Sequence, residues 1–340
     1  MMRRALVTGA TGFIGRYLVK ELLSRGWEIT CLVRPESQTK LLRRIPVRVI
    51  KGPANDRRIL EKALQDQDYV FHLAARIRGT SQHEYELANH RFTKDLVQAC
   101  LTVNPVLKRF VYVSSIAAAG PSAPGLIHDE TNPSSPVSEY GRTKLKGEEA
   151  VKAHWEKLSS TIIRPPNVYG AGQQETELLI KLIGKRIYPV LKERGKTTSL
   201  IYIKDLITGI LQAALSPKAI QEIYFLTDGQ FYSWKDIMFI LKKKVSGDAI
   251  TLPLYESVIF SAAFFFDLLK ALHILSSPFG RRAWKAMTQR TWLFSSAKAV
   301  HDFGFSPKYT LETGVQDMLD HEKTSIIQRP PQKHDASPAD

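Results

Sequence analysis

Hydrophobic positions in the first half of the chain alternate between short apolar runs and longer stretches with a helical repeat. The short runs are rich in β-branched residues, as expected for strands of a parallel sheet that helices cover on both faces. This alternation predicts an α/β fold with a doubly wound parallel sheet. Strands are expected at 4–8, 28–33, 47–51, 69–73, 109–114 and 161–164, and helices at 15–25, 56–64, 84–103 and 137–158.

The second half of the chain, after Pro165, has a weaker rhythm. Two stretches, 200–214 and 222–227, still have the pattern of strands and helices. We expect the chain to return to the sheet there, near 200–228. The remainder, 166–199 and 229–325, is expected to form a smaller, mainly helical lobe. The last residues, 326–340, are polar, contain prolines and lack periodicity, so a disordered tail is expected there.

The composition is that of an ordinary globular protein, with 44% hydrophobic and 24% charged residues in 340. Lysine and arginine exceed the acids by 48 to 33, a formal net charge of +15. This excess is compatible with phosphate-bearing ligands, anionic lipid or nucleic acid. No nucleic-acid-binding motif accompanies it, so no nucleic-acid partner is expected.

The cysteines and the first residues bear on the compartment. Only Cys31 and Cys100 occur, and neither lies in a CxxC pair, so we expect no disulfide framework and no metal site. The apolar run after Arg4 is broken by Gly9 and is too short for a signal peptide. We therefore expect a cytoplasmic protein.

The first expected strand runs directly into a glycine-rich turn, 8–15, and then into a helix. Glycines allow a tight turn and a close approach of the backbone to a pyrophosphate, and the helix N-terminus offers unpaired N–H groups to phosphates. A plain strand–helix turn would also favour glycine, but the place at the start of an α/β chain favours a ligand site. Residues 1–165 are therefore expected to be a dinucleotide-binding domain, with contacts from Gly9, Thr11, Gly12, Phe13, Ile14 and Gly15.

The end of the second expected strand bears on the choice of dinucleotide. An acid at this place commonly holds the ribose 2′-hydroxyl of NAD. This chain has Arg34 there, and a guanidinium would instead bind a 2′-phosphate through paired hydrogen bonds. We expect NADP(H), with NAD as the alternative if Arg34 is only a solvated loop residue.

Three residues form a candidate catalytic set. Tyr140 and Lys144 are spaced i and i+4, which places them on one helix face. A nearby ammonium favours the phenolate of a tyrosine, whose ordinary pKa is about 10, so the hydroxyl can exchange a proton near neutral pH. Ser115 follows an expected strand at the sheet edge where open α/β sheets bind ligands, and its hydroxyl could orient a reacting oxygen.

Several motifs agree with one another. Besides Gly-xx-Gly-xx-Gly at 9–15 and the Tyr140/Lys144 pair, the chain has His-Leu-Ala-Ala at 72–75, Val-Ser-Ser at 113–115 and Arg-Pro-Pro-Asn-Val-Tyr-Gly at 164–170. Together they resemble the extended short-chain dehydrogenase/reductase family, the NAD(P)-dependent epimerase/dehydratase superfamily, over residues 4–325. The number of residues between Ser115 and Tyr140 is also the one that this family usually shows.

The resemblance implies roles for individual residues. Tyr140 would be the general acid/base, Lys144 would bind the nicotinamide ribose and tune Tyr140, and Ser115 would polarise the substrate oxygen. The resemblance further implies cofactor contacts from Ala74, Ala75 and Asn89, and a substrate contact from Asn167.

Two features of the second half bear on the substrate. Nucleotide-sugar members of the family clamp a diphosphate with an arginine, and this chain has Thr198 at that position. Lys192, Arg194 and Lys196 lie just upstream and could take the place of that arginine. The segment 257–275 is apolar nearly all round a helix, with basic residues on both sides, and is too short to span a bilayer. We interpret it as a substrate lid or a helix at an anionic membrane face, with a buried core helix as the alternative.

These observations lead to one main hypothesis. We expect an NADP(H)-dependent oxidoreductase that interconverts a secondary alcohol and a ketone on a lipophilic small molecule, resembling the 3β-hydroxysteroid-dehydrogenase-like branch. The first alternative is an NAD(P)-dependent nucleotide-sugar epimerase or dehydratase, and the second is a redox-sensing regulator without turnover. The expected location is cytoplasmic. Peripheral contact with the inner membrane face through 257–275 is left open. Formation of a homodimer is also left open.

Overall fold

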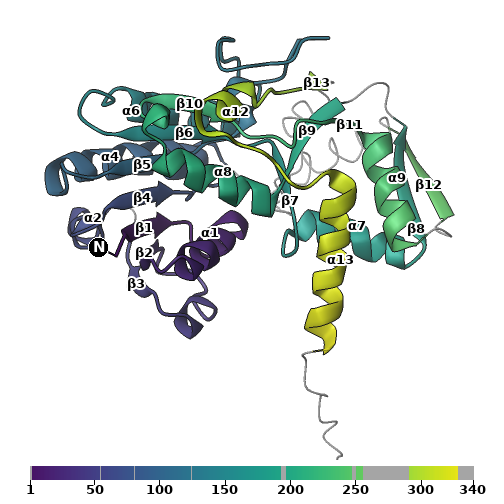
Figure 1. Cartoon of the computed structure of the whole chain (residues 1–340), viewed down its shortest axis with the longest axis horizontal. Helices are drawn as coiled ribbons and strands as arrows, with labels where there is room; N and C mark the ends of the chain where they lie inside the picture. Colours follow the sequence, from purple (N-terminus) through teal and green to yellow (C-terminus); the bar gives the residue numbers. More distant parts are fainter. Residues whose placement is uncertain are drawn as a thin grey trace, which may run out of the picture.

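The computed structural model describes residues 2–53, 55–79, 81–123, 125–192, 197–246, 250–255 and 291–327. Within these residues seven parallel strands form the main sheet, in the order β10-β6-β5-β4-β1-β2-β3 (Figure 1). The predicted doubly wound sheet is confirmed, and the six strands expected in the first half each start and end within one residue of their expected bounds. The strands are β1 Arg4–Thr8, β2 Glu28–Val33, β3 Arg48–Lys51, β4 Tyr69–His72, β5 Arg109–Val113, β6 Ser160–Arg164 and β10 Glu222–Phe225.

The strand order reverses beside β1. Strands β2 and β3 continue to one side of it, and β4, β5, β6 and β10 continue to the other. Such a reversal opens a crevice at the carboxyl ends of the strands, where ligands of open α/β sheets bind. The glycine turn follows β1 and therefore lies at this crevice.

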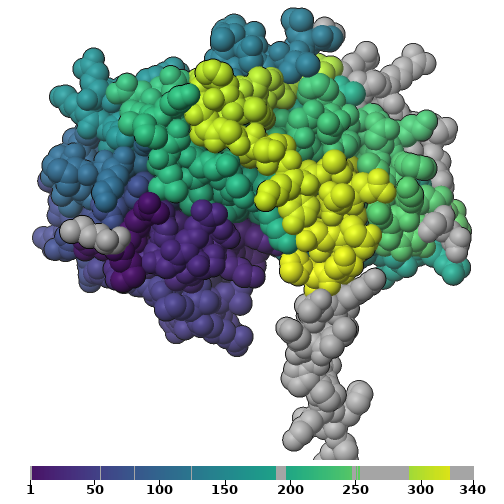
Figure 2. Space-filling view, viewed as in Figure 1, coloured from purple at the N-terminus to yellow at the C-terminus, as the bar shows by residue number. Residues whose placement is uncertain are grey.

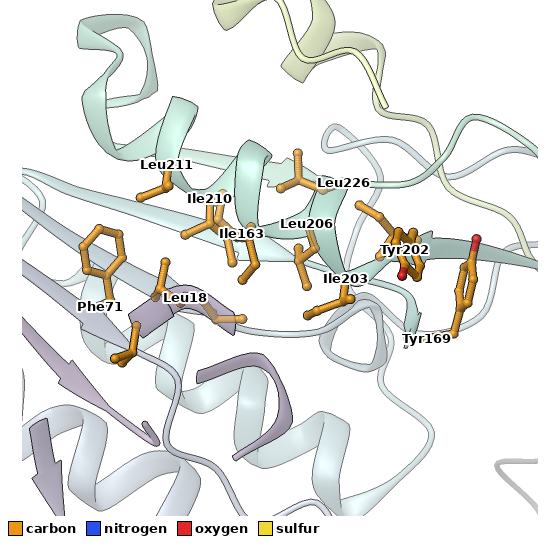
Figure 3. Close-up of a cluster of buried hydrophobic side chains, with 14 of the residues drawn as sticks. Leu18, Phe71, Ile163, Tyr169, Tyr202, Ile203, Leu206, Ile210, Leu211 and Leu226 are labelled. Atoms are coloured by element: carbon orange, nitrogen blue, oxygen red, sulfur yellow. The ribbon is translucent and has the colours of Figure 1, made fainter. Parts of the chain in front are cut away.

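Helices cover both faces of the main sheet. α1 (Phe13–Ser24) packs against α8 (Ile203–Leu215) on one face, and α4 (Phe92–Val103) packs against α2 (Arg57–Leu64) and α6 (Glu139–Lys152) on the other. Strand side chains alternate between two cores: Ala5 and Val7 contribute to the first, and Leu6 to the second. Figure 3 shows the first core, where residues of α8 meet α1, β4 and β6.

Helix α4 continues a longer helical stretch. This stretch begins with α3 (Gln82–Tyr85), continues as a π-helical turn over Glu86–Arg91 and ends with α4. The helix expected over 84–103 is thus present with a wider turn inside it. π-helical turns often accompany functional sites.

The smaller region contains helices and strands, where the sequence predicts mainly helices. Within the described residues β9 pairs with β7, β11 and β13, and β8 pairs with β12. β7, β11 and β13 are only two or three residues long, too short for a clear periodicity, and β8 and β12 each contain a proline, which weakens a strand prediction. The elements are β7 Asn167–Tyr169, α7 Gln174–Gly184, β8 Ile187–Lys192, β9 Thr197–Tyr202, β11 Phe231–Ser233, α9 Trp234–Val245, β12 Ile250–Tyr255, β13 Thr291–Trp292, α12 Ala297–Phe303 and α13 Leu311–Ile327.

The expected return over 200–214 divides between the two regions. Its strand, β9, joins the smaller sheet, whereas its helix, α8, covers the main one. The second expected return is confirmed, since β10 forms the edge of the main sheet beside β6. The division of domains at residue 165 stays a prediction.

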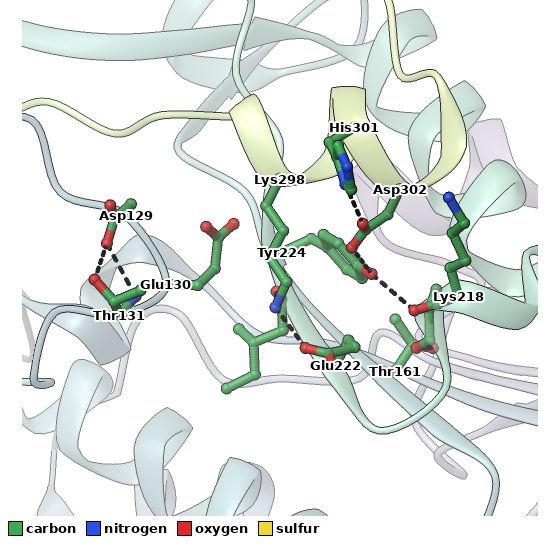
Figure 4. A network of polar contacts seen from close by, with 12 residues as sticks. Asp129, Glu130, Thr131, Thr161, Lys218, Glu222, Tyr224, Lys298, His301 and Asp302 are labelled. Carbon is green, nitrogen blue, oxygen red and sulfur yellow. Dashed lines mark hydrogen bonds and ion pairs between the residues drawn. The ribbon is translucent and has the colours of Figure 1, made fainter.

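Polar contacts hold α12 against the edge strand β10 (Figure 4). The Lys298 ammonium donates to the Glu222 carboxylate at 2.5 Å and to the Ile223 carbonyl oxygen at 3.2 Å. The Tyr224 hydroxyl lies 2.8 Å from Asp302 Oδ2, and Glu130 accepts the Phe225 N–H at 2.8 Å. The Ile223 carbonyl oxygen and the Phe225 N–H of this edge strand are thereby occupied, which disfavours addition of another strand at these positions.

The C-terminal helix α13 packs against α9 and β9. In the space-filling view its yellow surface lies between the purple N-terminal residues and the green residues near α9 (Figure 2). Among the described residues no helix combines the length and the apolar character that a bilayer crossing requires. Some of the expectations from the sequence concern residues outside the described ranges. These are the apolar segment 257–275, the basic residues Arg194 and Lys196, and residues 328–340 of the tail.

Candidate active site

The glycine turn has the backbone geometry that a phosphate cradle requires. Gly9 has φ +73°, and a Cβ on it would lie 2.7 Å from the Ala74 nitrogen; a Cβ on Gly15 would lie 2.8 Å from the Ala10 Cα. Helix α1 starts after Gly12 with no side-chain cap and no acid in its first turn. Its first N–H groups and its positive dipole end can therefore receive an anion, so the turn fits the pyrophosphate of a dinucleotide.

Behind the turn, a buried hydrogen-bond chain fixes the loop that follows β4. Thr8 Oγ1 lies 2.7 Å from His72 Nδ1, and His72 Nε2 lies 2.9 Å from Thr93 Oγ1. Thr8 Oγ1 also accepts the Ala74 N–H at 3.3 Å. Burial holds the pKa of His72 well below its usual value, so the ring is a neutral structural group. Ala74 and the exposed Ala75 are thus placed beside the glycine turn.

Asn89 has a positioning role that the resemblance does not suggest. Its side chain is fully buried, accepts the Arg76 N–H at 2.7 Å and donates to the Arg76 carbonyl oxygen at 3.1 Å and to Thr143 Oγ1 at 3.1 Å. These bonds join the loop after β4 to helix α6. Direct contact of Asn89 with a cofactor stays a prediction.

Arg34 lies just after β2, as the sequence places it, and its side chain is 61% exposed. Its guanidinium pairs with the Glu36 carboxylate at 3.2 Å. An exposed ion pair of this kind contributes about 0–1 kcal/mol of stabilisation, so a more highly charged anion could displace the Glu36 carboxylate from Arg34. Sequence reasoning did not single out Glu36.

Ser115 and Tyr140 come together where β5 ends and α6 begins. Ser115 caps the short helix α5 (Ile116–Ala119) by accepting the Ala117 N–H at 3.1 Å. Helix α6 is capped by Ser138, which places Tyr140 in its first turn. A Cβ on Gly141 would lie 2.9 Å from the Ala117 carbonyl carbon, so glycine there allows α6 to approach α5.

The two hydroxyl groups are linked. Burial raises the pKa of Tyr140 to about 12, and a hydrogen bond with Ser115 works in the opposite direction. The side chains of both residues remain partly exposed. The neutral phenol is therefore the resting form, and a neighbouring cation is needed for it to release its proton near neutral pH.

Lys144 supplies a cation in the interior. The side chain is 1% exposed; its ammonium donates to the Val113 carbonyl oxygen at 2.8 Å and lies 4.1 Å from the centre of the Tyr112 ring. Burial lowers the pKa of Lys144 to about 7, while the Glu148 carboxylate acts to raise it. A small change in surroundings would thus change its charge at physiological pH.

Glu148 and Arg164 form a buried pair that sequence reasoning missed. Arg164 Nε and Nη2 donate to the Glu148 carboxylate at 2.9 and 2.6 Å, and the Ser114 hydroxyl donates to the same group. The available signal was spacing, since Glu148 continues the series Tyr140, Lys144 at intervals of four.

On the substrate side, Asn167 is exposed at the start of β7. Thr198 lies opposite Trp292 in the pairing of β9 with β13, and its hydroxyl donates to the Ser199 carbonyl oxygen at 3.1 Å. Trp292 packs against a small apolar cluster that includes Ile116, the residue after Ser115. The position of the family's arginine clamp is therefore occupied by a hydroxyl beside an indole.

Comparisons with known proteins agree with this geometry. The family model for the NAD dependent epimerase/dehydratase family matches residues 5–226. The ceramide reductase of Caulobacter vibrioides is 27% identical and covers 92% of each chain. The sterol-4-alpha-carboxylate 3-dehydrogenase (decarboxylating) of Dictyostelium discoideum is 22% identical and covers 93% of this chain and all of the relative.

A solved structure is similar over nearly the whole chain. The UDP-glucuronic acid 4-epimerase from Bacillus cereus, in complex with NAD, has a TM-score of 0.74 at 25% identity and covers 95% of this chain and 99% of its own. The family match spans more than half of the chain, including the glycine turn, Ser115, Tyr140 and Lys144. The chain therefore belongs to the NAD dependent epimerase/dehydratase family, the extended short-chain dehydrogenases/reductases, and is an enzyme of that family.

Proposed function

We propose that this enzyme interconverts a ketone and a secondary alcohol on a lipophilic substrate, with NADP(H) as the preferred cofactor. The observation that carries the proposal is the convergence of Ser115, Tyr140 and Lys144 at the carboxyl end of β5, on the crevice that also contains the glycine turn. Proton transfer and dinucleotide binding are thereby available at one edge of the sheet.

The chain's own residues account for binding and for the proton. Hydride transfer is the chemistry that a nicotinamide dinucleotide supplies when bound. The turn from Gly9 to Gly15 and the first N–H groups of α1 would hold the pyrophosphate. Ser115 would hydrogen-bond the reacting oxygen, and Tyr140 would donate its proton to that oxygen in reduction or accept one in oxidation. The Lys144 ammonium would stabilise the phenolate that remains after donation.

Two observations support a lipophilic substrate. Thr198 cannot replace the charge-assisted clamp of a diphosphate, and it lies opposite Trp292, whose ring packs against Phe294. The relatives named above are a ceramide reductase and a sterol dehydrogenase, both named for lipids. Similarity to a UDP-sugar epimerase supports the fold and the NAD(P) site, which both substrate classes share.

Peripheral contact with an anionic membrane is part of the same proposal. The segment 257–275, which suggested it, lies outside the described residues. Beside it in the chain, Phe239 of α9 is 62% exposed, and Ile250 and Leu252 of β12 are also exposed. Lys235 and Lys243, one turn to either side of Phe239, are exposed as well. Apolar and basic groups together favour the surface of an anionic bilayer.

Turnover of a substrate panel tests the proposal. Oxidation of NADPH is followed with 3-keto sterols and 3-keto sphingolipids, and interconversion of UDP-glucose with NAD is followed in parallel. We expect turnover with the lipid ketones only, and conversion of UDP-glucose alone would overturn the proposed substrate class.

The Tyr140→Phe variant tests the proton step. We expect it to lower kcat by about 10²–10⁴-fold, because the ring stays while the proton donor is lost. The dissociation constant for NADPH, measured by fluorescence titration, should change little. Near-normal turnover would remove Tyr140 from the mechanism.

A further inference from the structure

Helix α6 carries a third polar residue on the face that presents Tyr140 and Lys144. Residues four apart lie on one face of a helix, and the series continues to Glu148. The face runs from the partly exposed Tyr140 through Lys144 to Glu148, whose side chain is fully buried. The proton step described above does not use Glu148.

The Glu148 carboxylate is bound by two residues next to the candidate catalytic set. Arg164, the last residue of β6, binds it through two nitrogens, and Ser114 donates to it from the position before Ser115. Arg164 Nη2 also donates to Ser134 Oγ at 2.9 Å. The Pro165 carbonyl oxygen accepts the Ile116 N–H at 3.0 Å, so the residues after Arg164 and Ser115 are joined too.

Stability alone is a weak reason for such a pair. Taking two charges out of water costs about as much as their attraction returns, and apolar replacements of buried pairs are often neutral or stabilising. The pair joins the end of β6 and the residues just after β5, next to Ser115, to α6, which carries Lys144. Its position therefore indicates a role in the site.

The surroundings of Lys144 show which group can act on its charge. From β4 it faces His72, which is neutral, and from β5 it faces the Tyr112 ring and the Val113 carbonyl oxygen. Its own helix contributes Tyr140 and Glu148. Across the site on β6, the Arg164 guanidinium is bound to Glu148. Of these groups Glu148 is the acid, and its charge opposes the effect of burial on Lys144.

We propose that Glu148 is a positioning residue of the active site: fixed by Arg164 and Ser114, its carboxylate keeps the Lys144 ammonium charged beside Tyr140. The inference rests on the proposed function, because that function assigns Lys144 its role. It adds that the charge of Lys144 is maintained from inside the protein before any ligand arrives.

The test measures the titration of Lys144 itself by NMR of protein labelled at lysine Cε, with the resonance assigned through Lys144→Met. We expect Glu148→Gln to lower the titration midpoint of Lys144 by about one pH unit or more, because an attracting charge is lost. Glu148→Asp should keep the midpoint close to that of the native enzyme. Glu130→Gln, which alters a carboxylate bound to the Phe225 N–H, serves as the matched control and should leave it unchanged.

Kinetics provide the second readout. With Glu148→Gln we expect kcat for ketone reduction to fall about tenfold above the new midpoint, and its pH optimum to move to lower pH, because Lys144 is charged only there. An unchanged Lys144 midpoint in folded Glu148→Gln would overturn the proposal. If that variant does not fold, Glu148→Gln combined with Arg164→Met is compared with Arg164→Met alone, so that both proteins lack the guanidinium, and equal Lys144 midpoints in the two would overturn the proposal.

Failure of the proposed function gives a different result. The Lys144 titration needs no substrate, so an enzyme without lipid-ketone activity would overturn that function while the midpoint shift remained. A lipid-ketone reductase whose Lys144 midpoint ignored Glu148 would overturn only the inference.

Discussion

At the scale of single residues, the surroundings decide what each cation can do. Lys144 is buried, and burial brings its pKa to about 7, where one nearby carboxylate influences its charge. Arg34 is exposed and pairs with Glu36 at the edge of the crevice, so its guanidinium can rearrange toward a ligand. In the proposed function, one basic residue would serve the proton step and the other would recognise a phosphate.

Replacing Arg34 by Asp should reverse the cofactor preference. The 2′-phosphate of NADP(H) would lose its countercharge and meet a like charge, so NADP(H) affinity should fall tenfold or more, while NAD(H) affinity stays or improves. Titration of both dinucleotides by tryptophan fluorescence measures this. Glu36→Gln is the control and should leave NADP(H) binding equal or tighter. A native enzyme that already prefers NAD(H) would show that Arg34 has no such role.

At the scale of elements, one buried carboxyl joins three of them. Asp228, just after β10, accepts the Gln230 N–H at 3.0 Å and the Tyr232 hydroxyl of β11 at 2.8 Å. That hydroxyl accepts the Leu311 N–H at the start of α13, at 3.1 Å. Burial raises the pKa of Asp228 to about 6. The junction of the smaller sheet with α13 therefore depends on a group that titrates in an accessible range.

This shift predicts how stability varies with pH. A carboxyl whose folded pKa is raised binds more protons when folded, so its contribution to stability falls as pH rises from about 4 to about 6. Asp228→Asn should remove that loss and raise the free energy of unfolding at pH 7.5 by about 1–3 kcal/mol, with no gain near pH 4. Thermal unfolding at several pH values measures it.

A second aspartate gives the control for this experiment. Hydrogen bonds from Thr131 lower the pKa of Asp129, so its contribution has the opposite sign and is lost as pH falls. Asp129→Asn should therefore cost stability at neutral pH. A pH profile for Asp228→Asn that parallels the native enzyme would contradict the assignment to Asp228.

At the scale of the whole molecule, net charge and exposed apolar groups bear on where the enzyme works. The chain carries +15, and the region of α9 and β12 exposes Phe239, Ile250 and Leu252 near lysines. A positive protein with apolar side chains on one surface is attracted to anionic lipid and is released by salt. If this region meets a membrane, the crevice and the membrane contact would serve one lipophilic substrate.

Co-sedimentation with phosphatidylserine vesicles tests this proposal. The native chain should bind at low salt and dissociate as salt rises, and Lys235→Gln should weaken binding about fivefold, since a lysine near the surface contributes about 1 kcal/mol. Phe239→Ser should weaken it further. Val106→Ser, at an exposed apolar residue before β5, is the control and should have no effect. Equal binding by Phe239→Ser and the native chain would exclude α9 as the contact.

The sequence by itself determined the main sheet, the glycine turn and the candidate catalytic set. These features depend on short-range information: strands buried on both faces are continuous apolar runs, and Tyr140 and Lys144 share a helix face through their spacing alone. Ser115 was identifiable because it follows a predicted strand, where the sheet topology puts ligands.

The tertiary structure decided the rest, because it depends on contacts between distant segments. β9 reads as a strand in the sequence, but only packing placed it in the smaller sheet with β7, β11 and β13. For Asn89 the resemblance implied a cofactor contact, and the structure adds bonds to Arg76 and Thr143 that no local pattern predicts. The pairing of Glu148 with Arg164 joins residues on two elements, and no local pattern shows which buried charges meet. A charge can be buried only where the fold supplies its partner, so such partners are known only once the chain is folded.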